Sequence, residues 1–186
     1  MGLGPDRGER RARYVAKARA ELGDLAARGV VMAGNAFSSV VLVKGLPGEG
    51  EQGAQGLLTK QDGSALRAAL QALGYAPEDW AGLAAWDDTG ELLSVELFRE
   101  ALCALDPATV ILCDEPAAQL AREAFAADLF LLERLDEAML ADGVVAQVAG
   151  MRMMALGGFA AALSDKREKQ IMWRRLKQLP PLGEPY

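Results

Sequence analysis

Apolar residues recur along this chain with two different periods, and the alternation of these periods predicts its secondary structure. Steps of three and four residues, typical of one helix face, occur in five segments. These predicted helices span 7–29, 63–75, 94–105, 116–140 and 164–179, the fourth in one or two pieces. Uninterrupted apolar or β-branched runs, typical of buried strands, lie between the helices. These predicted strands span 30–34, 39–44, 80–88, 108–115 and 143–150.

Residues at the segment ends predict where the helices begin and end. Ser94 and Ser164 are predicted N-caps, and either Asp62 or Ser64 is the predicted N-cap of the second helix, because short polar side chains accept hydrogen bonds from the free amides of a first turn. Gly74 is the predicted end of the second helix, since glycine readily adopts the left-handed conformation found there.

The order of these segments predicts a three-layer αβα fold with a central, mostly parallel sheet of about four strands. The sheet is expected to include 39–44, 108–113 and 144–149. Without an internal repeat or a linker, residues 1–186 are expected to form one domain, with a core over about 30–179 and an N-terminal helix. Ligands of such folds bind at the carboxyl ends of the strands.

The composition restricts the chemistry that this chain can perform. It has 186 residues, no histidine, and two cysteines, Cys103 and Cys113. The absence of histidine excludes Ser–His and Cys–His nucleophilic pairs and histidine metal ligands. Two cysteines do not make the four ligands of an iron–sulfur cluster, and no cofactor is expected. No apolar run suits a membrane helix or a signal peptide, so we expect a cytoplasmic protein without a membrane partner.

The net charge of −6 is distributed unevenly. Residues 1–28 and 165–186 each carry +3, whereas residues 29–164 carry −12. An acidic body does not suit a nucleic-acid groove, which needs cations to displace counterions. The basic ends either supply some of that charge or are solvated helix faces.

The turn after the strand 39–44 reads GLPGEGEQG, residues 45–53, and has three interpretations. A phosphate-binding loop would need a Gly-Lys-Ser/Thr sequence, and Glu49 and Glu51 would repel phosphate. A catalytic turn would use Glu49 or Glu51 as a general base, which makes them the candidate catalytic residues. The third interpretation is a glycine-rich turn with solvated acids.

Acidic and aromatic residues mark the ends of other strands. Asp87 and Asp114, each followed by another acid, could bind Mg²⁺ together with Glu49, because hard cations prefer carboxylate oxygens. Acids at such positions also occur without a metal, because helix N-termini favour them. Trp86 and Trp80 suit either stacking on a ring or packing in the core.

The order of the segments resembles the uracil-DNA glycosylase superfamily, most closely its iron–sulfur bacterial and archaeal branch. An apolar strand, a Pro-Gly turn with acids and a helix follow one another in VLVKGLPGEGEQGAQGLLTKQDGSALRAALQALGY. The family's next helix, strand and helix resemble LFREALCALDPATVILCDEPAAQLAREAF. Its last strand and closing helix resemble VVAQV and DKREKQIMWRRLKQL. The resemblance covers most of residues 30–179.

The resemblance implies a ligand pocket at the carboxyl ends of the strands and a reaction in which a flipped base is cleaved from its sugar. The implied pocket residues are Lys44, Gly45, Pro47, Gly48, Leu58, Trp86, Asp87, Asp114 and Met154. Several family residues are replaced. Gly45 stands where the family has a polar or acidic residue, Leu58 stands where it has the stacking aromatic, and its histidine near 154–158 is absent.

We therefore expect a divergent uracil-DNA glycosylase-like protein in which uracil excision is absent or near background. Its expected partner is DNA or a free base or nucleotide, with a protein partner as the other possibility. Two alternatives remain. One is an active DNA glycosylase with replaced catalytic residues, and the other is a metal-dependent hydrolase of small molecules that uses the strand-end carboxylates.

Overall fold

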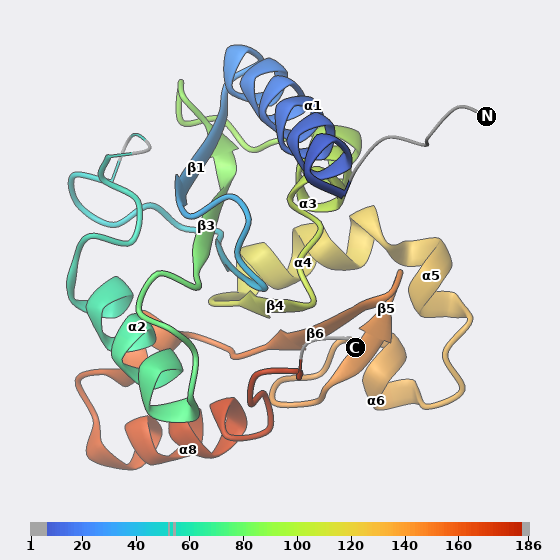
Figure 1. The fold of residues 1–186 in the computed structure, drawn as a ribbon. Coiled ribbons are helices and arrows are strands. Elements are labelled where there is room, and N and C mark those ends of the chain that lie inside the picture. The colour runs from blue at the N-terminus through green and yellow to red at the C-terminus, as the bar shows by residue number, and fades with distance from the viewer. Residues whose placement is uncertain (1–6, 52, 54, 184–186) are drawn as a thin grey trace.

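The structure, a computed structural model, describes residues 7–51, 53 and 55–183. It is an α/β fold in which a six-stranded mixed sheet lies between two layers of helices (Figure 1), as the alternating pattern predicts. The strands are β1 (Val30–Gly34), β2 (Val40–Lys44), β3 (Ala81–Asp87), β4 (Thr109–Leu112), β5 (Ala146–Val148) and β6 (Met151–Ala155).

The helices divide between the two faces of the sheet. One face is covered by α1 (Arg7–Ala27), α3 (Val95–Leu105), α4 (Glu115–Ala124) and α5 (Ala126–Phe130). The other face is covered by α2 (Gln61–Leu73), α7 (Phe159–Ala162) and α8 (Lys166–Leu176). The remaining short helix, α6 (Leu135–Ala138), follows α5.

The strand order is β1-β3-β2-β4-β6-β5. The four inner strands pair in parallel, with Val43 opposite Leu83 on one side and Leu112 on the other. The edge strands β1 and β5 pair antiparallel with β3 and β6. The expected number of about four mostly parallel strands therefore needs correction: the sheet has six strands, and the parallel four are only its centre.

The misassigned strand lies at the end of the sheet. Only Ala146–Val148 of the expected strand 143–150 is a strand, and it is antiparallel to its neighbour. The chain then reverses at Ala149 and Gly150, whose φ angles of 49° and 82° are those of a tight hairpin turn, and returns as the parallel strand β6. Methionines and an arginine in 151–155 conceal this strand from a propensity-based prediction.

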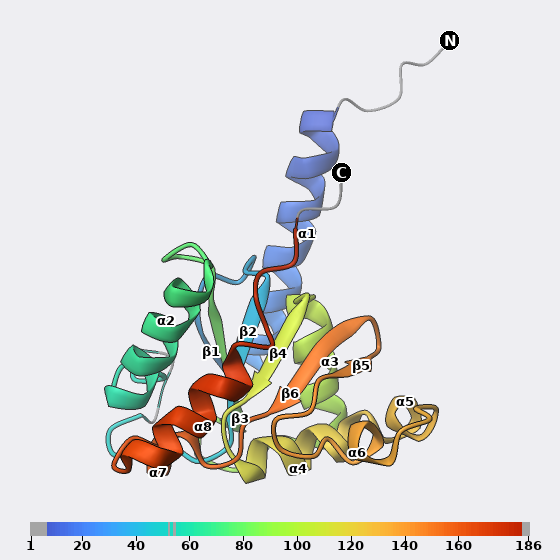
Figure 2. The ribbon, with the colours of Figure 1, turned by 90° about the horizontal axis from the view of Figure 1, so that it is seen from below.

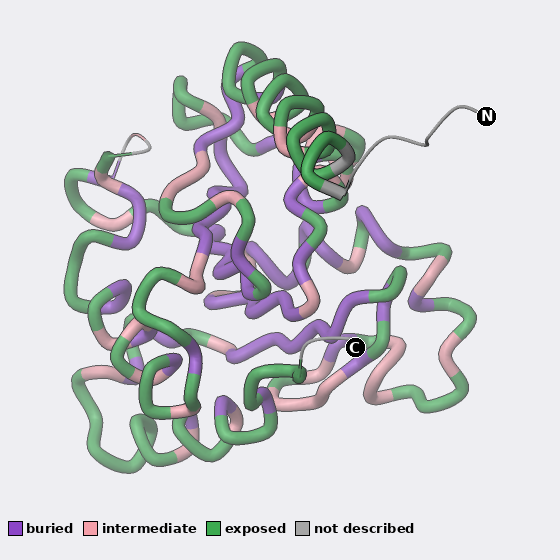
Figure 3. Tube along the Cα trace, in the orientation of Figure 1, coloured by how far each residue is buried: buried purple, intermediate pink, exposed green. Residues whose placement is uncertain are grey.

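Alternation along the inner strands creates two hydrophobic cores. On β2, Val41 and Val43 join the core under α3 and α4, while Val40 and Leu42 join the core under α2 and α8. All four side chains have no exposed surface. Figure 3 shows this burial concentrated in the sheet, while the outer helices are largely exposed. Strands buried on both faces explain the uninterrupted apolar runs in the sequence.

Two of the predicted helix ends are confirmed. The Oγ atom of Ser94 accepts a hydrogen bond from the amide of Leu97, 3.2 Å away, at the start of α3. Gly74 ends α2 with a φ of 106°. Both helix ends are predictable because they depend on one residue type each: a serine that caps free amides and a glycine that adopts the left-handed conformation.

The other helix predictions need correction. The N-cap of α2 is Lys60 and has no side-chain cap bond, so Asp62 and Ser64 lie within the helix instead of before it. The N-cap of α8 is Asp165, which accepts from two backbone amides, and not Ser164. The predicted helix over 116–140 is divided into α4, α5 and α6.

The end of the described chain is fixed to the amino ends of two inner strands. The hydroxyl of Tyr75 donates to the carbonyl of Leu179, 2.9 Å away. Arg152, which is buried, donates from Nη2 to the carbonyl of Pro180 and to Oγ1 of Thr109, each at 2.7 Å. Burial raises the pKa of the Tyr75 hydroxyl, so it stays protonated and can donate. We refer to these bonds as the tail clamp.

Within residues 7–51, 53 and 55–183, no helix combines the length and hydropathy needed to cross a bilayer.

Candidate functional site

A cleft lies at the carboxyl ends of β2, β4 and β6, where ligands of parallel α/β folds bind. It consists of two hollows of about 260 and 500 Å³ that share Lys44, Gly48, Asp62 and Ala160. The smaller hollow is also lined by Leu46, Pro47, Cys113, Asp114, Gly158, Phe159 and Ala161. The larger one is also lined by Glu49, Gly50, Lys60, Gln61 and Leu163.

Lys44, the last residue of β2, forms the centre of the cleft floor. Its side chain is only 7% exposed and pairs with the carboxylates of Glu51 and Asp62, the latter at 2.6 Å. Glu51 comes from the glycine-rich turn and Asp62 from the first turn of α2. We call these three residues the buried ion cluster.

Two opposing effects act on the pKa of Lys44. The larger single effect is burial, which disfavours the ammonium form, but the hydrogen bonds and charges of Asp62 and Glu51 together outweigh it. The pKa of Lys44 is therefore raised above its ordinary value. The side chain stays an ammonium group at neutral pH and has no free lone pair with which to act as a nucleophile or a base.

Glu51 holds the glycine-rich turn in shape. Besides its ion pair with Lys44, it accepts from the amide of Gly48 at 2.7 Å and from the amide of Leu58 at 3.2 Å. Its side chain is fully buried and lines neither hollow. Glu49, by contrast, is exposed and lies on the larger hollow. The two candidate catalytic residues thus have opposite environments.

Asp114 joins the same turn to the start of α4. Its carboxylate accepts from the amides of Gly45 at 2.9 Å, Leu46 at 3.0 Å and Ala117 at 3.0 Å. A Cβ atom at position 45 would lie 2.3 Å from the amide nitrogen of Ala117. Glycine at position 45 is therefore required by close packing of the turn against α4.

Two of the implied pocket residues lie in the core beneath the cleft. Leu58 has no exposed surface, and its side chain packs over Gly82, where a Cβ would approach it to 2.9 Å. Met154, on β6, is also fully buried beside Ile111 of β4. Neither side chain lines the cleft.

The two implied residues of β3 lie away from the cleft lining. Trp86 is 2% exposed, and its indole Nε1 has no hydrogen-bond partner among the described residues. Asp87 accepts from the hydroxyl of Thr89 at 2.6 Å, and this bond is the main reason for the lowered pKa of Asp87. Its carboxylate therefore stabilises a turn.

The described residues contain no group of three or more His, Cys, Asp or Glu side chains able to hold a metal ion. Glu49, Asp87 and Asp114 are thus not brought together as the magnesium alternative requires.

Both cysteines are free: Cys103 is exposed, whereas Cys113 is buried at the end of β4. Burial raises the pKa of the Cys113 thiol, so it stays a neutral part of the cleft floor.

Sequence reasoning missed the far wall of the cleft. Gly158, Phe159 and Ala160 line it because β6 ends at Ala155 and directs the following chain over the carboxyl edge. It also missed Asp62 as the partner of Lys44. A lysine at the end of a fully buried apolar strand was the available signal, since a buried ammonium group requires nearby carboxylates.

No family model matches this chain, and no curated protein matches it.

Proposed function

We propose that this chain is a divergent uracil-DNA glycosylase-like protein whose carboxyl-edge cleft binds a nucleobase or nucleotide without excising uracil. The observation that carries the proposal is the saturation of the cleft floor. Lys44 pairs with the carboxylates of both Glu51 and Asp62, and Asp114 is occupied by backbone amides. This fixed geometry supports a role in binding.

The same saturation argues against base excision. A general base needs a carboxylate within hydrogen-bond reach of its substrate, and Glu51 is turned into the loop. Charge that develops on a departing base needs a preorganised donor, and the loss of one such donor typically costs a factor of about 10² to 10³ in rate. The chain has no histidine for this role. Glu49 remains as an exposed carboxylate at the rim.

The walls of the smaller hollow favour a flat, partly polar ligand. Leu46, Pro47 and Phe159 provide apolar contact. At the floor, Lys44 has one N–H beyond its two ion pairs, and the Asp62 carboxylate has further lone pairs, so a donor and an acceptor remain for a ligand. Ligand sites of this type combine apolar walls with a few polar groups that fix the orientation of the ligand. A nucleobase, with ring faces and an edge of donors and acceptors, matches this combination.

The first test measures uracil release from single- and double-stranded uracil-containing DNA at low salt. We expect release at background level. Release that falls when Glu49→Gln or Glu51→Gln is introduced would instead establish the active-glycosylase alternative.

The second test measures binding of uracil, adenine and dUMP by calorimetry. Ala160 is exposed and lines both hollows, so Ala160→Trp is expected to block binding by filling the cleft. Ala126→Trp, at an exposed position on α5, is the matched control and is expected to bind like the wild type. Failure of all three probes to bind the wild type would overturn the proposed ligand class.

A further inference from the structure

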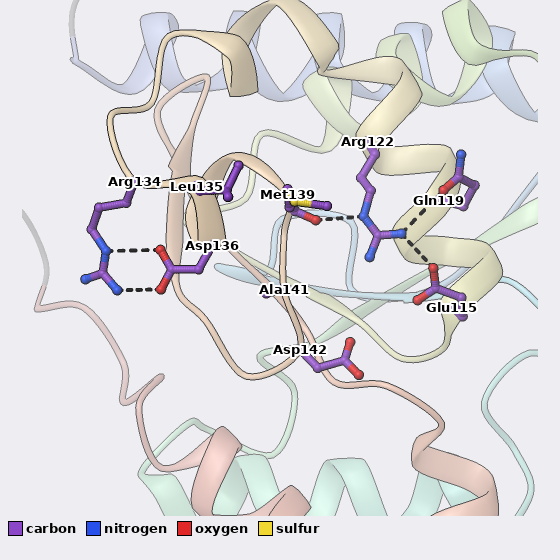
Figure 4. A pocket seen from close by; sticks show the side chains of 9 residues that line it. All are labelled: Glu115, Gln119, Arg122, Arg134, Leu135, Asp136, Met139, Ala141 and Asp142. Carbon is purple, nitrogen blue, oxygen red and sulfur yellow. Dashed lines mark hydrogen bonds and ion pairs between the residues drawn. The ribbon is translucent and has the colours of Figure 1, made fainter.

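A second, larger hollow lies between α4 and α6, outside the cleft already described. Its volume is about 970 Å³. Figure 4 shows Arg122 of α4 directed toward the carbonyl of Met139 on one side and Arg134 paired with Asp136 on the other. The lining residues are Glu115, Gln119, Arg122, Arg134, Leu135, Asp136, Met139, Ala141 and Asp142. We call this hollow the α4–α6 groove.

The α4–α6 groove is bordered by large apolar side chains that have no cover. Leu135 is 74% exposed and Met139 is 59% exposed, and both line it. Phe130 and Leu131, just before it in the chain, are 87% and 80% exposed. Leu135 and Met139 thus give the groove an exposed apolar lining, which is typical of an interaction surface, and Phe130 and Leu131 lie exposed within ten positions along the chain.

The surroundings of this groove are acidic. Residues 115–142 carry seven acidic and two basic side chains, and Arg99 and Arg175 from outside this range pair with Asp128 and Asp142, which leaves an excess of three negative charges. Both arginines within the range are already neutralised, because Arg122 lies 2.7 Å from Glu115 and Arg134 lies 2.5 Å from Asp136. A basic partner with an apolar side chain would therefore complement the groove in charge and in hydrophobicity.

The first half of α1 has these properties. Residues 7–19 carry six basic side chains and one acidic side chain, a net charge of +5. Figure 2 shows this half of the helix extending beyond the body of the molecule, while Leu25 anchors the other half in the core. Tyr14 is 59% exposed, and Arg11 stands three residues before it on the same helix face.

We propose that this chain forms a dimer by reciprocal exchange of helix α1. The basic half of α1 of each copy docks in the α4–α6 groove of the other, with Tyr14 against the patch of Leu135 and Met139. Two identical contacts related by a twofold axis close the assembly, so no open chain of copies results. The proposal does not depend on what the cleft binds.

Analytical ultracentrifugation of the full chain tests this arrangement. We expect a dimer at micromolar concentration in 50 mM salt. In 500 mM salt the dissociation constant of the dimer should be at least about tenfold higher, because screening weakens the charge attraction. The helix variant Arg11→Glu/Arg13→Glu and the groove variant Leu135→Glu/Met139→Glu should each be monomeric. Lys166→Glu/Lys169→Glu, an equal charge change on the exposed start of α8, is the control and should remain dimeric.

Mixing the two monomeric variants gives the sharpest result. Reciprocal exchange predicts that a mixture regains association, since one intact helix can still meet one intact groove, whereas neither variant associates alone. Circular dichroism melting curves check that each variant is folded. A monomeric wild type would overturn the proposal. So would a dimer lost only in the groove variant, which would indicate contact between two grooves without the helix.

Discussion

Lys44 is a charged residue at the end of a strand whose other side chains are fully buried. Removal of one partner from a buried ion pair leaves an uncompensated charge, which typically costs about 3–5 kcal/mol. We therefore expect Lys44→Met to lower the free energy of unfolding by about that amount, measured by urea denaturation. Lys60→Met, at an exposed position on the same cleft, should change it by less than about 0.5 kcal/mol.

Neutralising all three residues of the buried ion cluster distinguishes the stability lost through an unpaired charge from the stability lost through altered packing. The triple variant Lys44→Met/Glu51→Gln/Asp62→Asn has no unpaired charge, so it should recover part of the stability that Lys44→Met loses. If Lys44→Met were as stable as the wild type, the buried ion cluster would not be what fixes the turn.

The raised pKa of Lys44 also predicts a dependence of stability on pH. A group whose pKa is higher in the folded than in the unfolded state stabilises fully below its unfolded value, which for lysine is about 10.5. That stability is lost as the pH rises through the folded pKa. The difference in unfolding free energy between the wild type and Lys44→Met should therefore be constant from pH 7 to 9 and shrink above about pH 10.5. A difference that persists unchanged at pH 11.5 would contradict this account.

Between elements, the joint that matters most to the cleft is the one between the turn after β2 and the start of α4. Asp114→Ala removes an N-cap and frees the amides of Gly45 and Leu46, so we expect a loss of about 2 kcal/mol. Hydrogen exchange at these two amides should become faster. Glu115→Ala, which removes a solvent-exposed ion pair with Arg122 one position later, should have little effect on either measurement.

The elements that the sequence predicted well are those with a local cause. An apolar run sufficed for β2 and β4, and a capping serine sufficed for the start of α3. β6 was missed because its strand character comes from pairing with β4 and not from its own residue types. The division of 116–140 into three helices likewise has no strong local signal, since no glycine or proline interrupts it after Pro116.

The sequence indicated which segments line the cleft, but it did not indicate which side chains pair with one another there. The turn after β2 and the acid after β4 do line the cleft, as the carboxyl-edge rule requires. The pairing of Lys44 with Glu51 and Asp62 depends on how the turn folds back over the strand, which no spacing rule expresses. Trp86 and Met154 were expected at the pocket but lie in the core, because their strands direct these side chains beneath it.

Across the whole molecule, the two faces of the sheet are completed at different points of the chain. The face under α1, α3, α4 and α5 receives its helices before residue 131. The opposite face depends on α7 and α8, which occupy residues 159–176. The second face is thus assembled from one early helix, α2, and the last two.

The tail clamp gives this order a consequence for the protein during its synthesis. Tyr75 and Arg152 find their acceptors at Leu179 and Pro180, which lie 104 and 28 residues further along the chain. Until α8 and the residues that follow it have left the ribosome, no closing helix covers Met154 and Ile111, and this face of the sheet stays an open hydrophobic surface. The second core is therefore the last part of this fold to close during synthesis, and the interval before it closes is when the exposed apolar surface most needs protection by chaperones.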